Sequence, residues 1–226
     1  MDDHPVRSQL RSWLASAEFQ KILEAALEQR RMIGALFSMT FDADPLIRWR
    51  AIDAIGRCAG RLATLRPESM KNFIRRLFWM MNDESGSVAW HAPEAIGEIV
   101  RSDPREFGSF IPMTISLLDM EPEDRPSFMP GILHALGRIG EVAPHSMDAY
   151  LPQIENALTD RDVQTRAMAV LCLARLSEKN RLLQYGDLLH DAGRALVYRD
   201  EQLVETAISN LLCNVLDGSK CHPEVF

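Results

Sequence analysis

Apolar residues recur at helical spacing along most of the chain, in segments that are separated by short polar turns. The first two segments run from Val6 to Leu14 and from Glu18 to about Leu27, and both are rich in residues that favour helices. Further segments of the same kind follow as far as Leu216. The pattern therefore predicts an all-α protein with an irregular tail.

The segments also repeat. The stretch from Asp44 to Gly56 can be laid over the stretch from Asp83 to Gly97 without a gap through its helical half. The matched residues, each 41 positions apart, are Ile47 and Val88, Trp49 and Trp90, Ala51 and Ala92, Ala54 and Ala95, Ile55 and Ile96, and Gly56 and Gly97. Later units follow at gaps of 40, 35 and 40 residues. A period of this length is typical of stacked helix pairs that share one core.

Each repeat is expected to contain an outer and an inner helix. The expected outer helices are 31–41, 67–81, 103–118, 144–158 and 181–196. The expected inner helices begin near Asp44, Ser87, Phe128 and Asp160, and the fifth contains Leu203, Ala207 and Leu211. Pro93 falls inside the second inner helix and is expected to kink it, while Gly56 is expected to let a neighbouring helix come close.

The repeats predict one domain over residues 1–226. Residues 1–30 are expected to form an N-terminal helical cap with a polar outer face, which a stack of repeats needs in order to stay soluble. Residues 31–216 are expected to form about five helix pairs. Residues 217–226 mix Gly, Ser, Lys and Pro and are expected to be irregular.

Two motifs resemble HEAT repeats: Asp44-x-x-Ile47-Arg48-x-x-Ala51-x-x-Ala54-Ile55-Gly56 and Asp160-x-x-Val163-x-x-x-Ala167. The resemblance covers about residues 31 to 215 and is greatest to the short HEAT-like repeats of bacterial proteins that are often labelled with the phycobilin lyase repeat. It implies a right-handed α-α superhelix, a HEAT/armadillo-like solenoid whose second helices line a concave surface that holds partners. It implies no particular chemistry.

One face of the inner helices carries most of the candidate chemistry. Residues four apart share a helical face, so positions 49, 53 and 57 are expected to lie together, as are their equivalents in the next two units. The predicted partner-binding residues are Trp49, Asp53, Arg57, Trp90, Glu94, Glu98, His134 and Arg138.

These residues also have purely structural interpretations. Burial of an indole of about 200 Å² is worth roughly 5 kcal/mol, so Trp49 and Trp90 would equally well cover the seam between inner helices. Arg57, Glu98 and Arg138 alternate in sign and would form a salt-bridge ladder worth about 0 to 1 kcal/mol per pair. Both interpretations stay open beside the binding role.

Metal sites are not predicted. Asp53, Glu94 and His134 are metal-ligand types, but neighbouring helices lie about 8 to 10 Å apart, which is wide for three ligands on one ion. The C-terminal trio Cys213, Cys221 and His222 contains no Cys-x-x-Cys pair and is a weak zinc motif.

Charge narrows the classes of partner. The formal net charge is −7, which argues against a surface that holds nucleic acid by general electrostatics but leaves room for a local basic patch. Four cysteines are too few for a disulfide scaffold, so a reducing cytoplasm is the expected location. The N-terminus does not resemble a secretory signal, and no apolar run approaches the roughly 20 residues that span a bilayer.

The expected function is a non-catalytic HEAT-repeat interaction module that binds a protein or peptide partner in its groove. No catalytic residue and no cofactor is predicted, and the sequence does not define the oligomeric state. One alternative is an enzyme, because Trp49-x-x-x-Asp53 and Trp90-x-x-x-Glu94 resemble the aromatic-plus-carboxylate arrangement of HEAT-like alkylpurine DNA glycosylases. A second alternative is a cofactor-handling protein similar to the bilin lyases, which share the repeats.

Overall fold

The computed structural model describes residues 4–81, 89–120 and 125–217. The chain divides into two compact units. Unit one is Met1–Pro112 together with Tyr198–Leu203, and unit two is Met113–Val197 together with Val204–Phe226. The single solenoid domain over residues 1–226 stays a prediction. The predicted irregular tail, 217–226, lies outside the described residues except for Asp217.

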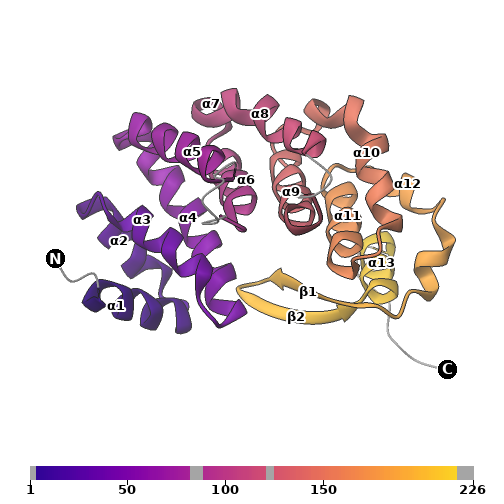
Figure 1. Ribbon diagram of the computed structural model, residues 1–226, viewed down its shortest axis with the longest axis horizontal. Coiled ribbons are helices and arrows are strands. Elements are labelled where there is room, and N and C mark those ends of the chain that lie inside the picture. The colour runs from indigo at the N-terminus through magenta and orange to yellow at the C-terminus, as the bar shows by residue number, and fades with distance from the viewer. Residues whose placement is uncertain (1–3, 82–88, 121–124, 218–226) are drawn as a thin grey trace. The chain divides into compact units, whose positions relative to one another are not determined.

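Unit one is built from helices (Figure 1). They are α1 (His4–Ala15), α2 (Phe19–Glu28), α3 (Met32–Ser38), α4 (Pro45–Leu65), α5 (Pro67–Met81), α6 (Ala92–Ser102) and α7 (Pro104–Phe107), with 3₁₀ turns at Met39–Phe41 and Gly108–Phe110. A short helix α8 (Ile111–Ile115) follows at the boundary with unit two. The order agrees with the predicted cap followed by outer and inner helices.

Helix α4 is the centre of unit one. It begins where the Asp44 side chain accepts a hydrogen bond from the backbone N–H of Leu46, and Pro45 takes the first helical position, where no N–H is needed. Its apolar stripe is buried and packs against α1, α2, α3, α5 and α6. The stripe includes Ile47, Ala51, Ala54, Ile55, Cys58 and Leu62.

Unit two contains two longer helices, α9 (Arg125–Gly140) and α11 (Val163–Arg175), which pack against each other. Between them lie α10 (Leu151–Asn156) and 3₁₀ turns at Pro144–Tyr150 and Ala157–Thr159. The chain then continues through α12 (Lys179–Leu182), a 3₁₀ turn at Gly186–His190, strands β1 (Arg194–Arg199) and β2 (Gln202–Ala207), and α13 (Ile208–Asp217), which packs on α11.

The inner helices α4 and α11 share one capping arrangement. In both, the side chain of a first aspartate accepts a hydrogen bond from the backbone N–H of a second aspartate two residues later. The second aspartate caps the helix. An arginine donates a hydrogen bond to the backbone carbonyl of the first aspartate. The two sets are Asp42, Asp44 and Arg48, and Asp160, Asp162 and Arg166. The sequence pattern predicts that Asp160 begins the fourth inner helix. This prediction is wrong by two residues, because Asp162 caps α11.

The predicted fold class, all-α and built from paired helices, is confirmed. The second inner helix differs in detail, because α6 begins at Ala92 and not near Ser87. Pro93 therefore lies in the first turn, where its missing N–H breaks no helical hydrogen bond and no kink results. Trp90 precedes the helix, and Val88 and the rest of 82–88 lie outside the described residues.

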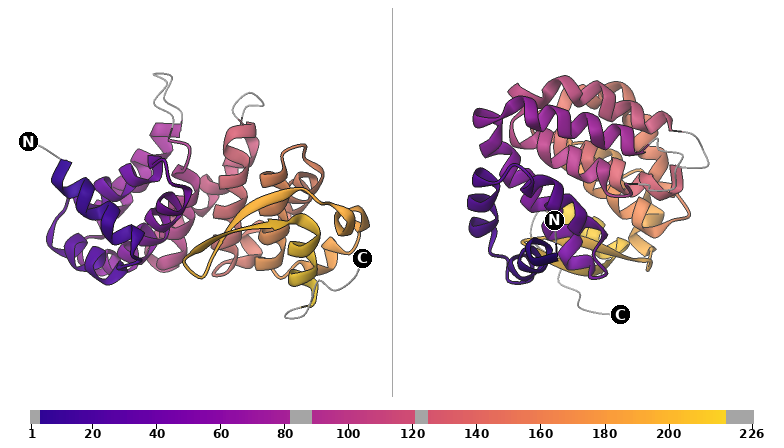
Figure 2. Two further views of the ribbon diagram at one scale, coloured as in Figure 1. Left: turned by 90° about the horizontal axis from the view of Figure 1, so that it is seen from below. Right: turned by 60° about the vertical axis from the view of Figure 1, so that its left-hand side comes forward.

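The prediction of a fifth helix pair is wrong. Residues 194–207, which were expected to end an outer helix and begin an inner one, form a two-stranded antiparallel hairpin of β1 and β2 that Figure 2 shows as a long curved ribbon. Leu-Val-Tyr and Leu-Val-Glu-Thr flank the polar pair Asp200-Glu201. Aromatic and β-branched residues on either side of a two-residue turn favour a hairpin over a helix.

The close contact of α4 with α6 gives a test of the packing. A Cβ added at Gly56 would lie 2.8 Å from the Cβ of Glu98, as expected from a glycine that admits a neighbouring helix. We expect Gly56→Ala to lower the free energy of unfolding by about 1 to 3 kcal/mol, measured by urea denaturation. Gly34→Ala in α3, where nothing lies within 4 Å, is the matched control and is expected to raise it by about 0.5 to 1 kcal/mol. Equal effects of the two substitutions would contradict this packing.

Candidate partner-binding site

The polar face of α4 is the part of the predicted site with the best defined geometry. Asp53 and Arg57 form a two-pronged ion pair, with Arg57 Nε 2.8 Å from Oδ1 and Arg57 Nη2 2.9 Å from Oδ2. The guanidinium also lies over the ring of Phe19, 3.9 Å from its centroid. We use the name Trp49 surface for the surface that Phe19 of α2 forms together with four residues of α4. These four are Trp49, Arg50, Asp53 and Arg57.

The chain's own hairpin tip occupies this surface. Tyr198–Leu203 belongs to unit one, and the ring of Tyr198 stacks on Trp49 with centroids 5.8 Å apart and planes at 9°. The Tyr198 hydroxyl donates a 3.0 Å hydrogen bond to Oδ2 of Asp53. The tip thus places an aromatic ring and its hydroxyl against a tryptophan and a carboxylate.

Glu201 supplies a second anchor in the same tip. Its carboxylate accepts a hydrogen bond of 2.7 Å from Arg57, and its backbone carbonyl accepts one of 3.0 Å from Arg50. Arg50 is buried and also donates to the carbonyls of Leu14 and Ala15 at the end of α1. Arg50 therefore links the cap helix to the hairpin tip.

The turn that carries Glu201 is strained. Asp200 and Glu201 have φ angles of 51° and 61°, in the left-handed region that non-glycine residues avoid at a cost of roughly 1 to 2 kcal/mol each. Strain of this kind persists only where surrounding contacts hold it. The pairing of β1 with β2 across the two-residue turn imposes these angles, and the bonds from Arg50 and Arg57 to Glu201 add to it.

Burial and charge shift the pKa values of two groups in the cluster. Burial raises the pKa of Tyr198 well above its usual range, and the adjacent Asp53 carboxylate raises it further. Burial alone would lower the pKa of Arg57, but hydrogen bonds to Asp53 and Glu201 outweigh it and raise that pKa. At neutral pH Tyr198 therefore keeps the proton that it donates to Asp53, and Arg57 keeps its positive charge.

The second predicted set lies on and beside α6. The side chain of Trp90 is 45% exposed, and Glu94 and Glu98 are both buried. Glu94 Oε1 lies 3.0 Å from His91 Nδ1, and Glu98 accepts a hydrogen bond of 3.1 Å from Arg101. Because Trp90 lies outside the helix, it does not share a helical face with Glu94 in the way that Trp49 shares one with Asp53.

The third predicted set belongs to α9 in unit two. His134 is buried, and Arg138 donates a hydrogen bond of 2.6 Å to Glu141. Arg57, by contrast, pairs within unit one. The salt-bridge ladder through Glu98 and Arg138 stays a prediction, as does the role of all eight residues in binding a partner.

Sequence reasoning missed Tyr198 and Glu201, because the region was assigned to helices. The signal that could have found them is the hairpin pattern around Asp200-Glu201. It also missed Phe19, which was assigned only to the cap. The mutual proximity of Trp49, Asp53 and Arg57 was expected and is confirmed by their contacts.

The described ranges were compared with the requirements of a metal site and of a membrane-spanning helix. Within residues 4–81, 89–120 and 125–217, no group of three His, Cys, Asp or Glu side chains is arranged to hold a metal ion. Cys213 has a free thiol, while Cys221 and His222 lie outside the described residues. In the same ranges, no helix combines the length and the apolar character that a membrane crossing needs.

Comparisons with known proteins find two archaeal relatives of note. The chain is 26% identical over 193 residues to an uncharacterized protein of Archaeoglobus fulgidus, an alignment that covers 80% of this chain and 94% of the relative. Among solved structures, it is similar to the archaeal HEAT-like repeats protein from Thermococcus onnurineus, at 16% identity, with 93% of this chain and 98% of that chain covered and a TM-score of 0.35. No family model matches the chain.

A TM-score of 0.35 is too low to carry an argument about the fold, so the fold class depends on the helix pairs of this chain itself. Nothing in these matches points to the phycobilin-lyase subtype, and both relatives are archaeal and not bacterial.

The raised pKa of Tyr198 gives a pH-dependent test of the tip contact. Above about pH 10 an unfolded tyrosine loses its proton while folded Tyr198 keeps it, so the free energy of unfolding falls as pH rises. We expect Tyr198→Phe to lower that free energy by about 1 to 2 kcal/mol at pH 8, because the bond to Asp53 is lost. The variant should also lose less stability than the wild type between pH 8 and 10.5, measured by urea denaturation. Parallel pH dependences would show that Tyr198 is not held in this contact.

Proposed function

We propose that the protein is a non-catalytic interaction module, and that the Trp49 surface holds an exposed turn of a protein or peptide partner. HEAT-like helix pairs commonly present such surfaces. The observation that supports the proposal most is the hairpin tip, because it is a peptide segment bound to the residues that the sequence singled out.

The tip also suggests the chemistry of the partner. It offers an aromatic hydroxyl at Tyr198 and a carboxylate at Glu201, three residues later, across a tight turn. A partner with the same pattern would stack on Trp49, donate to Asp53 and accept from Arg57. Aromatic and arginine side chains are the usual anchors of protein interfaces.

Such a partner would compete with the hairpin tip. The left-handed φ angles at Asp200 and Glu201 belong to the two-residue hairpin turn itself, so the tip keeps its shape when it leaves the surface. The module would then exist with its own tip bound or with the partner's turn bound. The intramolecular tip sets the affinity threshold that a partner has to exceed.

The other two functions have no specific observation in their favour. In the glycosylase hypothesis Asp53 would assist bond cleavage, but its two oxygens already accept hydrogen bonds from Arg57 and Tyr198. The bilin-lyase hypothesis has no residue in this cluster that selects it. The free thiols of Cys58, Cys172 and Cys213 are consistent with a reducing, cytoplasmic setting, which we include in the proposal.

The proposal can be tested with the chain's own hairpin as the probe. A synthetic peptide of residues 194–207, closed at its ends by a disulfide and labelled, is titrated into the Tyr198→Ala/Glu201→Ala double variant. We expect binding by fluorescence anisotropy with a dissociation constant on the order of 100 μM or tighter, because the variant lacks both side-chain anchors of its own tip. Wild-type protein should bind the same peptide at least tenfold more weakly, because its own tip competes.

Two further substitutions in the double variant separate the Trp49 surface from nonspecific adsorption. Trp49→Ala should abolish peptide binding, whereas Trp79→Ala, which removes a tryptophan that is 66% exposed on α5, should leave it unchanged. A peptide with the tyrosine changed to alanine should not bind. Absence of binding to a folded double variant, or equal binding to all variants, would contradict the proposal.

A further inference from the structure

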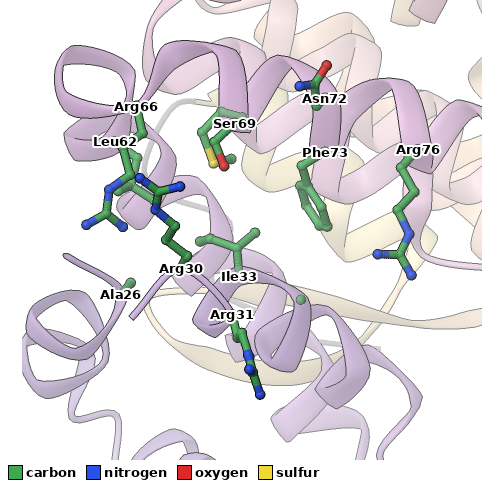
Figure 3. A pocket seen from close by; sticks show the side chains of 12 residues that line it. Ala26, Arg30, Arg31, Ile33, Leu62, Arg66, Ser69, Asn72, Phe73 and Arg76 are labelled. Atoms are coloured by element: carbon green, nitrogen blue, oxygen red, sulfur yellow. The ribbon is translucent and has the colours of Figure 1, made fainter. Parts of the chain in front are cut away.

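A second candidate site lies in unit one, between the α2–α3 turn and helix α5. A cavity of about 410 Å³ opens there, within the range of about 300 to 1,000 Å³ typical of small-molecule sites. We call it the arginine pocket, after the four arginines in its lining (Figure 3). They are Arg30, Arg31, Arg66 and Arg76.

Three parts of unit one bring these arginines together. Arg30 and Arg31 lie in the turn between α2 and α3, and Arg66 lies between α4 and α5. On α5, Ser69, Asn72, Phe73 and Arg76 follow one another at helical spacing and line the same cavity. In Figure 3, Arg30 and Arg66 lie on one side of the view and Arg76 on the other, with the Phe73 ring between them.

The pocket concentrates positive charge in an acidic chain. The whole protein carries a formal net charge of −7, yet no Asp or Glu lines this cavity. A second hollow, of about 820 Å³, shares Arg30, Arg31 and Arg76 and adds Arg7. The local excess of cations therefore extends beyond the pocket itself.

The pocket arginines differ from several other arginines of unit one. Arg11, Arg57 and Arg101 each pair with a carboxylate. Within the described part of the chain, none of the four pocket arginines forms an ion pair. Three of them, Arg30, Arg31 and Arg76, are exposed, so an anionic ligand can reach them from solvent.

One of the four is already fixed in position. Arg66 donates a 2.7 Å hydrogen bond from Nη2 to the carbonyl of Leu27 near the end of α2, and its side chain is half-buried. A guanidinium has five N–H donors, so the others remain for a ligand. A donor held in place loses less entropy on binding, and this preorganisation is typical of a binding site.

The floor of the cavity is apolar. Ile33, Leu62 and Met70 are buried beneath it, and Phe73 is half-buried at its wall. An edge-on contact with Phe37, at 5.9 Å between centroids, holds the Phe73 ring. The pocket thus combines a flat aromatic surface with several guanidinium groups.

We propose that the arginine pocket binds a nucleotide, a nucleoside diphosphate or triphosphate, with its phosphates on the arginines and its base against Phe73. Guanidinium forks match phosphate oxygens in two-pronged hydrogen bonds. A di- or triphosphate carries several negative charges on adjacent groups, which complements a lining that holds four arginines and no carboxylate. Ser69 and Asn72 offer further hydrogen bonds to the ligand. The site does not depend on the function proposed for the Trp49 surface.

The test is calorimetric titration of the full chain at low salt with ADP, pyrophosphate and adenosine. ADP is expected to bind most tightly, pyrophosphate at least about tenfold more weakly, because it lacks the ring, and adenosine not measurably, because it lacks the phosphates. ADP affinity should fall steeply as salt is raised. No binding of ADP at 1 mM would overturn the proposal, and so would adenosine binding as tight as that of ADP.

Variants assign the binding to the pocket. Arg30→Gln/Arg76→Gln should weaken ADP binding at least about tenfold, and both side chains are exposed without ion pairs, so the fold should be unaffected. Arg61→Gln on α4 removes an exposed arginine outside the pocket and should leave the affinity unchanged. Phe73→Leu should weaken ADP and leave pyrophosphate unchanged. An equal loss of ADP affinity in the Arg61→Gln variant would overturn the nucleotide assignment. A single-stranded oligonucleotide that binds more tightly than ADP, and whose binding is weakened by Arg30→Gln/Arg76→Gln, would overturn it as well.

Discussion

The burial of one stripe of α4 is the constraint on which unit one depends. That stripe must stay in contact with several helices at once, so the rotation of α4 about its own axis is fixed. Fixing the buried side also fixes the opposite side, because a helix has one rotation for all its residues. Trp49, Asp53 and Arg57 are therefore presented together as a consequence of core packing.

Gly56 contributes to the same constraint from within the helix. Its missing side chain lets α6 approach so closely that the backbone of Glu98 lies against α4. Helices in such close contact cannot slide or rotate past each other without steric clashes, because protein interiors are densely packed. The polar face of α4 is thereby held on a rigid element, on which Trp49, Asp53 and Arg57 keep one arrangement.

Most of the helical architecture could be predicted from the sequence, for a physical reason. The helical period of apolar residues and the prolines and aspartates at helix starts determine structure over only a few residues. Helices α4 and α5 accordingly begin at Pro45 and Pro67, as the sequence predicts. The start of α6 could not be placed, because the repeat match carried the helix back to Ser87 while Pro93 fits only a first turn. The cap at Asp162 was missed since two aspartates stand two apart and only the folded backbone distinguishes them.

The candidate site could be predicted only in part. The tryptophan, the aspartate and the arginine of α4 follow from spacing, but their contacts to Tyr198 and Glu201 join residues about 145 positions apart in the chain. No local pattern encodes a pairing over that distance, and the apolar residues of the hairpin fit a helical period well enough to be misassigned. The arginine pocket was hidden for the same reason, since Arg30 and Arg76 are brought together only by the fold.

The left-handed turn at Asp200 and Glu201 joins two requirements in one residue. A change of Glu201 to glycine would relax the backbone but would also remove the carboxylate that Arg57 holds. A residue at position 201 that suits the turn best thus loses the contact with Arg57, and a residue that keeps this contact carries the strained backbone.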